Sequence, residues 1–271
     1  MTQKPTIFVN IAAYRDAETY ATIRDLFDKA KHPDNLHVSV CWQYNSLCEE
    51  PFVMNDRKHQ VSVINIDYRK SQGCSWARHV AQKTYNNETY YLQVDAHSRF
   101  IPNWDAIMIE ELARCNSLKP ILSTYPNAYT LPNTLGNDIP YKLIFNTWQS
   151  RVPTFHTRAC DESEKTIPSP SLMIGGGLIF SYAEAILDVP YDPNLYFIGD
   201  EIAMSVRYWT HGYDMFTPTK ALVFHLYVEP SLVKNYNWSD NTDWHTKYES
   251  SSRARILHLL GIEKTNDPRA L

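Results

Sequence analysis

A carboxylate and an imidazole lie two positions apart at the end of a short apolar segment. Asp95 and His97 follow residues 90–94, whose composition is typical of a buried β-strand. In an open α/β sheet, ligands gather at the carboxyl ends of the strands, where two side chains spaced i, i+2 can turn toward one ion. A carboxylate with an imidazole suits a borderline divalent cation such as Mn²⁺ better than Ca²⁺. The pair predicts a metal site; the alternative is that Asp95 caps a turn and His97 is a surface residue.

Three consecutive glycines interrupt a second apolar segment. The chain holds only 8 glycines in 271 residues, about 3% against a usual ~7%, yet Gly175, Gly176 and Gly177 lie together. Glycines inside a strand mark a place where the backbone approaches another group closely. That group is either a ligand or a packed helix, and the residues alone do not choose between the two.

Two acidic residues, a later histidine and an arginine complete the set of side chains that could do chemistry. Asp200 and Glu201 open a helix predicted over residues 200–211, where Asp at the N-cap and Glu in the first turn satisfy free N–H groups. The functional alternative is that one carboxylate faces a cleft. His225 lies in an apolar strand, where a lone histidine is more often a core residue. Arg78, early in a helix, either clamps a phosphate or is solvated.

The elements that must position these residues alternate between strand and helix over the first half of the chain. Apolar patterns predict strands at residues 6–10, 36–42, 61–67 and 90–95. They predict helices at residues 16–30, with Asp16 as N-cap, at 74–85 and at 104–115. This alternation predicts an α/β fold with a largely parallel sheet.

The second half of the chain is less regular. Between residues 120 and 170 the pattern dissolves among prolines, which predicts a functional loop region or a hairpin at residues 141–148. Regular structure resumes at 171–181, followed by the helix at 200–211 that Gly212 ends, a strand at 222–226 and a last helix near 251–260. Because no internal repeat or linker interrupts the chain, residues 1–271 are predicted to form a single domain.

Charge and cysteine content exclude several classes of protein. Lys+Arg is 26 and Asp+Glu is 30, a net charge of −4, which argues against nucleic acid or an anionic membrane as partner. The 5 cysteines include no C-x-x-C pair and fit neither a disulfide framework nor a cysteine-rich zinc module. The first residues show no signal-peptide pattern, and the most apolar charge-free stretch contains prolines and glycines. We therefore expect no membrane span and a cytoplasmic location.

The order of these motifs resembles that of retaining glycosyltransferases of the GT-A type. The series is similar to the polypeptide N-acetylgalactosaminyltransferases and, more closely, to glycosyltransferase family 60. The best-known member of that family is a cytoplasmic enzyme that adds α-N-acetylglucosamine to hydroxyproline on the adaptor subunit of SCF ubiquitin ligases. The likeness spans roughly residues 6–227 and rests on segments 8–15, 73–78, 91–97, the glycine run, 191–193, 196–201, 207–209 and His225.

The resemblance implies a Rossmann-like nucleotide-diphospho-sugar transferase fold with a mixed, mostly parallel sheet flanked by helices. It implies UDP-N-acetylglucosamine (UDP-GlcNAc) as donor and a divalent metal, Mn²⁺ or Mg²⁺. The metal ligands it implies are Asp95, His97 and His225, and the nucleotide-binding residues are Ala12, Tyr14, Arg15, Arg78 and Asp95. Gly176, Gly177, Asp200 and Glu201 would hold the donor sugar, with Asp200 and Glu201 as the catalytic candidates and no covalent nucleophile among them.

The sequence differs from the polypeptide N-acetylgalactosaminyltransferases in one motif and in the expected absence of a lectin domain. Asp200 and Glu201 stand where those relatives have Glu-Asn, so which carboxylate faces the sugar stays open. No counterpart of their lectin domain follows the catalytic pattern.

Four functions are compatible with these residues. The first is transfer of N-acetylglucosamine (GlcNAc) to a protein hydroxyl, with hydroxyproline of the SCF adaptor as the expected acceptor. The second is a UDP-sugar transferase that builds a cell-surface glycan. A metal-dependent hydrolase that uses Asp95, His97 and His225 is the third, and a non-catalytic nucleotide-sugar binding protein is the fourth. The aromatic-rich residues 227–244 predict an acceptor groove or a homodimer contact, with simple packing over the sheet edge as the alternative.

Overall fold

Apolar residues occupy both faces of the first strand, so this strand lies inside the molecule. In the strand β1 (Ile7–Tyr14), Ile7, Val9 and Ile11 face one cluster of buried residues and Phe8 faces another. A strand buried on both faces is typical of an α/β protein, in which helices cover the sheet on each side. The computed structural model describes residues 4–227 and 235–267, apart from the side chain of Trp244.

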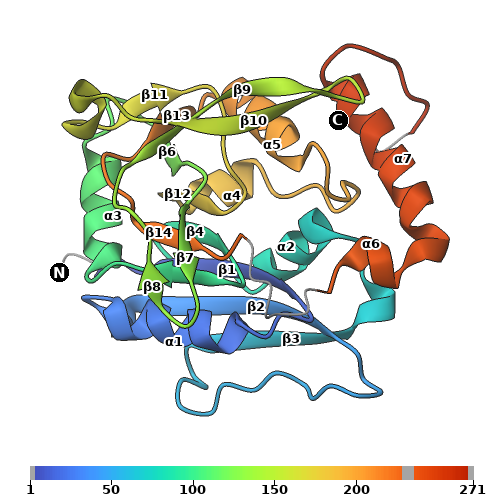
Figure 1. Cartoon of the computed structure of the whole chain (residues 1–271), viewed down its shortest axis with the longest axis horizontal. Helices are drawn as coiled ribbons and strands as arrows, with labels where there is room; N and C mark the ends of the chain where they lie inside the picture. Colours follow the sequence, from blue (N-terminus) through green and yellow to red (C-terminus); the bar gives the residue numbers. More distant parts are fainter. Residues whose placement is uncertain (1–3, 228–234, 268–271) are drawn as a thin grey trace.

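The described part of the chain forms a central eight-stranded sheet (Figure 1). Its strands are β1, β2 (Leu36–Tyr44), β3 (Val61–Asp67), β4 (Tyr90–Asp95), β6 (Pro120–Ser123), β11 (Ser169–Ser171), β12 (Leu178–Tyr182) and β13 (Asp214–Thr217). They lie in the order β11-β13-β6-β12-β4-β1-β2-β3. The neighbours β3, β2, β1 and β4 are parallel, as are β6 and β13, whereas β12 and β11 run antiparallel to their neighbours. The prediction of an α/β fold with a mixed, mostly parallel sheet is confirmed.

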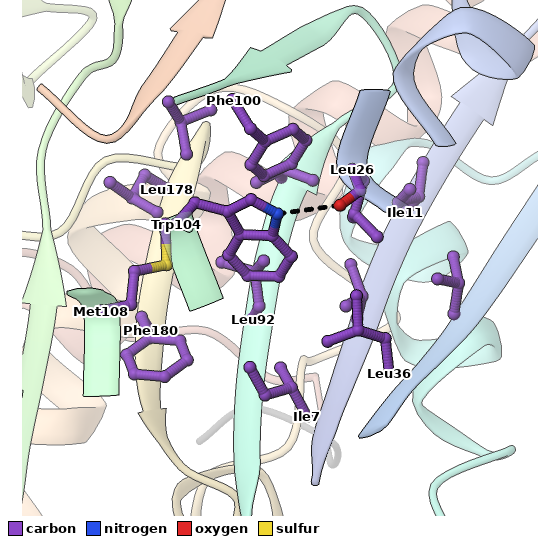
Figure 2. Packing of buried hydrophobic residues seen from close by; sticks show 14 of the residues in the cluster. Ile7, Ile11, Leu26, Leu36, Leu92, Phe100, Trp104, Met108, Leu178 and Phe180 are labelled. Carbon is purple, nitrogen blue, oxygen red and sulfur yellow. Dashed lines mark hydrogen bonds between the residues drawn. The ribbon is translucent and has the colours of Figure 1, made fainter. Parts of the chain in front are cut away.

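Helices cover both faces of this sheet. The helices α1 (Thr19–Lys29) and α3 (Trp104–Ala113) contribute residues to the larger cluster on one face. Figure 2 shows the indole of Trp104 inside that cluster, with Nε1 donating a hydrogen bond to the carbonyl of Leu26 at 2.8 Å. On the other face lie α2 (Cys74–Gln82), α4 (Glu184–Asp188) and α5 (Asp200–Thr210).

A smaller sheet and a hairpin flank the central sheet. The smaller sheet has the order β5 (Ser98–Phe100), β14 (Val223–His225), β7 (Asn127–Thr130) and β8 (Thr134–Leu135). The hairpin consists of β9 (Tyr141–Gln149) and β10 (Val152–Ala159). The chain then ends in α6 (Asn237–Asp240) and the long helix α7 (Thr242–Leu259) (Figure 1). Short 3-10 helices cover Pro33–Asn35, Tyr68–Lys70 and Glu162–Lys165.

Several local predictions were wrong. Asp16 is not the N-cap of the first helix, because that helix begins at Thr19 with Glu18 as its N-cap. Asp200 is not an N-cap either, since Gly199 holds that position at φ 87° and Asp200 is the first helical residue. The stretch 120–170 contains a hairpin, but residues 141–149 form only its first strand and it continues to Ala159. The same stretch also contains β6, β7, β8 and β11, and the last helix begins at Thr242 rather than near residue 251.

Most of the other elements confirm the sequence pattern, with small shifts at their ends, but the regular structure expected at residues 171–181 begins only at Leu178. The strands at 61–67 and 90–95 have the predicted bounds, and the helix that follows Gly73 ends at Gln82. None of the helices in the described residues is both long and apolar enough to cross a membrane.

Candidate active site

A cavity of about 620 Å³ opens at the end of the sheet where β1 and β4 finish. Its walls come from sequence positions as far apart as Ala12 and Trp238. All the candidate residues named from the sequence line it: Ala12, Tyr14, Arg15, Arg78, Asp95, His97, Gly176, Gly177, Asp200, Glu201 and His225. The structure therefore brings together side chains that the sequence places in separate motifs.

Strand pairing brings the three predicted metal ligands close together. Asp95 is the last residue of β4, and the chain continues through His97 into β5. Strand β14 pairs antiparallel with β5 so that His225 lies opposite Ser98. The Nε2 atoms of His97 and His225 are 2.9 Å apart, and Nε2 of His225 is 3.2 Å from Oδ2 of Asp95. One ligand atom from each of the three residues lies within 4.8 Å of the others.

The donor set fits a divalent cation of borderline softness. It offers one carboxylate oxygen and two imidazole nitrogens, the combination that Mn²⁺ and its neighbours accept. Burial alone would raise the pKa of Asp95, but the hydrogen bond from His225 and the charge of Arg78 outweigh it and hold that pKa well below its ordinary value. Asp95 is thus ionised at neutral pH, as a metal ligand must be.

Arg78 is the buried centre of the site's ion pairs. Its Nη2 donates to Oδ1 of Asp95 and to the carbonyl of Gly176, each at 3.1 Å. Its Nη1 donates to Oδ2 of Asp200 at 2.9 Å and to the hydroxyl of Tyr191 at 3.3 Å. With a side chain only 5% exposed, the guanidinium fixes the two carboxylates. Its predicted contact with a diphosphate stays a prediction.

The three consecutive glycines have no room for larger side chains, because other groups of the protein pack closely against them. A Cβ on Gly176 would lie 3.1 Å from Nη2 of Arg78, and one on Gly177 would lie 3.0 Å from Pro126. A Cβ on Gly175 would lie 2.9 Å from the backbone of Thr124. The close approach that the sequence predicts is therefore made by other parts of this chain, while Gly176 and Gly177 also face the cavity.

The two acidic residues at the start of α5 both face the cavity but bind different partners. Asp200 pairs with Arg78, and burial nonetheless keeps the pKa of Asp200 raised. Oε1 of Glu201 accepts the N–H of Gly176 at 2.7 Å, and its Oε2 accepts the hydroxyl of Tyr125. Burial and the adjacent charge of Asp200 raise the pKa of Glu201 to about 7. A hydrogen-bonding role toward a polar ligand is open to both carboxylates.

Three of the predicted nucleotide-binding residues, Ala12, Tyr14 and Arg15, lie at the end of β1, next to the C-terminal helices. Arg15 has φ 48°, and its guanidinium pairs with Glu49 at 2.7 Å and with Asp240 at 2.8 Å. The hydroxyl of Tyr14 donates to Asp240 at 3.0 Å. Ala12 lies two residues earlier, where its small side chain leaves room in the cavity.

Three residues of the site were not predicted from the sequence. Asp16 binds His97, Tyr125 binds Glu201, and Asp240 binds both Tyr14 and Arg15. A signal existed for Asp16, because it is a carboxylate just beyond the end of a strand, but the helix pattern that follows it favoured a cap. Tyr125 and Asp240 carry no local signal, since their partners are 76 and 225 or more residues away.

The prediction for residues 227–244 falls partly outside the described residues, which omit 228–234 and the side chain of Trp244. Within the described part, Tyr227, Tyr236 and Trp238 line the cavity. A homodimer contact stays a prediction.

Comparison with known proteins identifies the family. A family model described as Glycosyltransferase (GlcNAc) matches residues 6–57 and 48–270, nearly the whole chain. The chain belongs to this family. No curated protein matches the sequence of this glycosyltransferase.

The similarity to the solved structure of GalNAc-T7 shows that this glycosyltransferase has the GT-A fold. GalNAc-T7, solved with UDP, GalNAc and Mn²⁺, is similar with a TM-score of 0.65 and 15% identity over 96% of this chain and 53% of that chain. TarS of S. aureus, residues 1–349, is similar with a TM-score of 0.49 and 12% identity over 82% of this chain and 60% of that one. The glycosyltransferase thus spans about half the length of the GalNAc-T7 chain.

Proposed function

We propose that this glycosyltransferase transfers GlcNAc from UDP-GlcNAc to a protein hydroxyl in the cytoplasm, with retention of the α configuration and with a divalent metal, Mn²⁺ or Mg²⁺. The expected acceptor is hydroxyproline, of the kind found on the adaptor subunit of SCF ubiquitin ligases. One observation carries the proposal: Asp95, His97 and His225 converge in the cavity that the other predicted donor-binding residues also line. We propose further that residues 1–271 act as one catalytic domain.

Two other observations support this proposal. The family's description names GlcNAc, and the similar GalNAc-T7 structure contains UDP and Mn²⁺. The resemblance of segments 8–15, 73–78, 91–97 and 196–201 to family 60 supports hydroxyproline as the acceptor.

In the proposed reaction, Asp95, His97 and His225 hold the cation. A divalent cation there supplies positive charge beside the diphosphate as it leaves the sugar. Arg78 keeps Asp95 ionised and in place, and it orients Asp200 at the same time. Asp200 and Glu201 form hydrogen bonds with the hydroxyls of the donor sugar.

Neither Asp200 nor Glu201 is proposed as a nucleophile. Arg78 engages Asp200, and Gly176 and Tyr125 engage the two oxygens of Glu201. A pKa of about 7 also leaves Glu201 partly protonated at neutral pH, which weakens it as a nucleophile. We therefore propose that the acceptor hydroxyl attacks from the face that the diphosphate leaves, and that a diphosphate oxygen takes its proton.

The metal site is tested with Asp95→Asn, which keeps the shape of the side chain and removes its charge. We expect UDP release from UDP-GlcNAc in the presence of Mn²⁺ to fall at least about 100-fold, because an amide is a poor cation ligand. Asp34→Asn is the matched control, since the Asp34 side chain is 94% exposed and lies outside the cavity. Wild-type turnover in Asp95→Asn would refute the metal-dependent mechanism.

Donor and acceptor are tested separately. A panel of UDP-sugars with Mn²⁺ is expected to give the fastest UDP release with UDP-GlcNAc. A hydroxyproline peptide is then compared with the same peptide carrying proline, and with oligosaccharides. If transfer occurred only to oligosaccharides, the proposed acceptor would be a glycan and not a protein. Consumption of a substrate without a nucleotide, unaffected by UDP, would replace the transferase with a hydrolase.

A further inference from the structure

Asp16 contacts His97, one of the proposed metal ligands, at the ring nitrogen that faces away from Asp95 and His225. Its Oδ2 lies 2.6 Å from Nδ1 of His97, and both side chains are about one-fifth exposed. A contact this short is typical of a hydrogen bond to a charged acceptor. It requires the ring proton of His97 to be on Nδ1, so the lone pair of Nε2 points toward Asp95 and His225.

The carboxylate of Asp16 is itself fixed in orientation. Its second oxygen, Oδ1, accepts the backbone N–H of Glu18 at 2.9 Å. Its backbone carbonyl accepts the hydroxyl of Thr19 at 2.9 Å. Since the side chain and the backbone are both held at the start of α1, the direction of the bond to His97 is set before any ligand binds.

The same helix also holds the backbone on either side of His97. The hydroxyl of Thr22 donates to the carbonyls of Ala96 at 2.8 Å and Ser98 at 3.0 Å, and it accepts the N–H of Ser98 at 2.8 Å. With the backbone fixed in this way, the remaining freedom of His97 is the rotation of its side chain. Asp16 removes that freedom.

We infer that Asp16 is a positioning residue for the cation, acting through His97 by fixing its ring orientation and its tautomer. The inference rests on the proposed function, since it concerns the same metal site. It adds a fourth residue to that site and makes the loop between β1 and α1 part of it. Tyr14, the last residue of β1, and Arg15, which are two of the predicted nucleotide-binding residues, come directly before Asp16 in the chain.

The experiment measures Mn²⁺ binding to the whole chain without a donor, from the electron paramagnetic resonance signal of free Mn²⁺. Removing an outer carboxylate that orients a histidine ligand weakens metal affinity by about 10- to 100-fold, and we expect a loss in this range for Asp16→Ala. Asp16→Asn, which retains an acceptor oxygen without the charge, should lose less. In a His97→Ala background, Asp16→Ala should weaken Mn²⁺ binding no further, because its effect passes through that ring.

Asp25→Ala is the control for a merely structural role. Asp25 lies on α1 and holds β5, since its Oδ2 accepts the N–H of Phe100 at 2.7 Å, but it lies outside the cavity. We expect it to lower the melting temperature while leaving Mn²⁺ affinity within about twofold.

Three outcomes would overturn the inference. Unchanged Mn²⁺ affinity in Asp16→Ala would overturn it alone and leave the proposed function standing. A further loss of affinity in the His97→Ala background would show that Asp16 does not act through His97. Absence of Mn²⁺ binding to the unmodified chain, even with UDP added, would overturn both this inference and the proposed metal dependence.

Discussion

Glu201 illustrates how a single side chain at this site depends on its surroundings. Burial and the negative charge of Asp200 raise its pKa to about 7, although the hydrogen bonds from Gly176 and Tyr125 favour the charged form. In the unfolded chain the same carboxyl has its ordinary pKa, 4.5. Between these values the folded protein holds a proton on Glu201 that the unfolded chain has released, so the contribution of Glu201 to the stability of the fold decreases as pH rises from about 4.5 to about 7.

Glu201→Gln should therefore flatten the dependence of stability on pH. The amide keeps the size of the side chain and can still accept the N–H of Gly176, but it does not ionise. We expect the difference in unfolding free energy between pH 5 and pH 7, measured with urea, to shrink in this variant. Glu162→Gln, at a side chain that is 89% exposed, should leave the difference unchanged. If the unfolding free energy of Glu201→Gln depended on pH as steeply as that of the unmodified chain, the dependence would come from another group.

Among the elements, α7 supports one wall of the cavity from outside. Ile256 packs so closely on Gly199 that a Cβ there would lie 2.6 Å from its Cδ1. The hydroxyl of Ser252 accepts the N–H of Tyr196 at 3.0 Å. Arg255 pairs with Asp192, and both side chains are almost fully buried, at 3% and 4% exposure. The helix thus holds the segment that leads into Asp200.

Arg255→Ala tests this support. It leaves the buried charge of Asp192 without its partner, and breaking a buried pair in this way costs about 3–5 kcal/mol. We expect urea unfolding to show a loss of that size, together with lower activity because the wall of the cavity shifts. Arg253→Ala removes an exposed arginine from the same helix and should cost little. Equal effects from the two variants would contradict a supporting role for the buried pair.

The sequence predicts elements well where one local pattern decides them. Strands β1 to β4 and helices α1 to α3 and α5 follow from apolar periodicity, and α2 and α5 also from glycines at their ends. Strand β6 was missed because it is only 4 residues long and begins with a proline. The hairpin turn contains Ser150 and Arg151, both with positive φ, where glycine or asparagine would have been the recognisable signal.

The candidate site was predictable in its residue types but not in its internal contacts. Asp95, His97 and His225 could be named because carboxylate and imidazole side chains in an ordered series of motifs resemble a known family. The roles of Asp16 and Tyr125 depend on which side chains meet across the fold, and no spacing in the sequence encodes that. Arg78 was expected to contact a phosphate. Its bonds to Asp95 and Asp200 connect the separate elements α2, β4 and α5, so no local pattern in the sequence indicates them.

For the molecule as a whole, the charge of the cavity makes the proposed binding of the donor and the proposed binding of the metal depend on each other. Among the described residues that line the cavity, Asp95, Asp200 and Glu201 lie around the buried guanidinium of Arg78. A diphosphate is repelled by such an excess of carboxylates unless a cation is bound with it. Affinity for UDP should therefore depend on the metal.

Thermal unfolding provides the measurement. A UDP–Mn²⁺ complex that binds as a single ligand, present at about 100 times its dissociation constant, should stabilise the fold by about 2.7 kcal/mol and so raise the melting temperature by roughly 5–10 °C. UDP alone should give a much smaller shift, and Asp95→Asn should abolish the difference between the two conditions. A full shift with UDP alone, in the presence of a chelator, would contradict the charge argument.

The cavity is closed by contacts between the first strand and the last helices, such as the bond from Tyr14 to Asp240, 226 positions later. A ribosome that has synthesised the first two hundred residues has therefore produced most of the fold but not the wall that completes the pocket. Nascent polypeptides and fragments cut ahead of Asp240 lack this bond, so we expect the proposed activity to begin only when synthesis has passed that point.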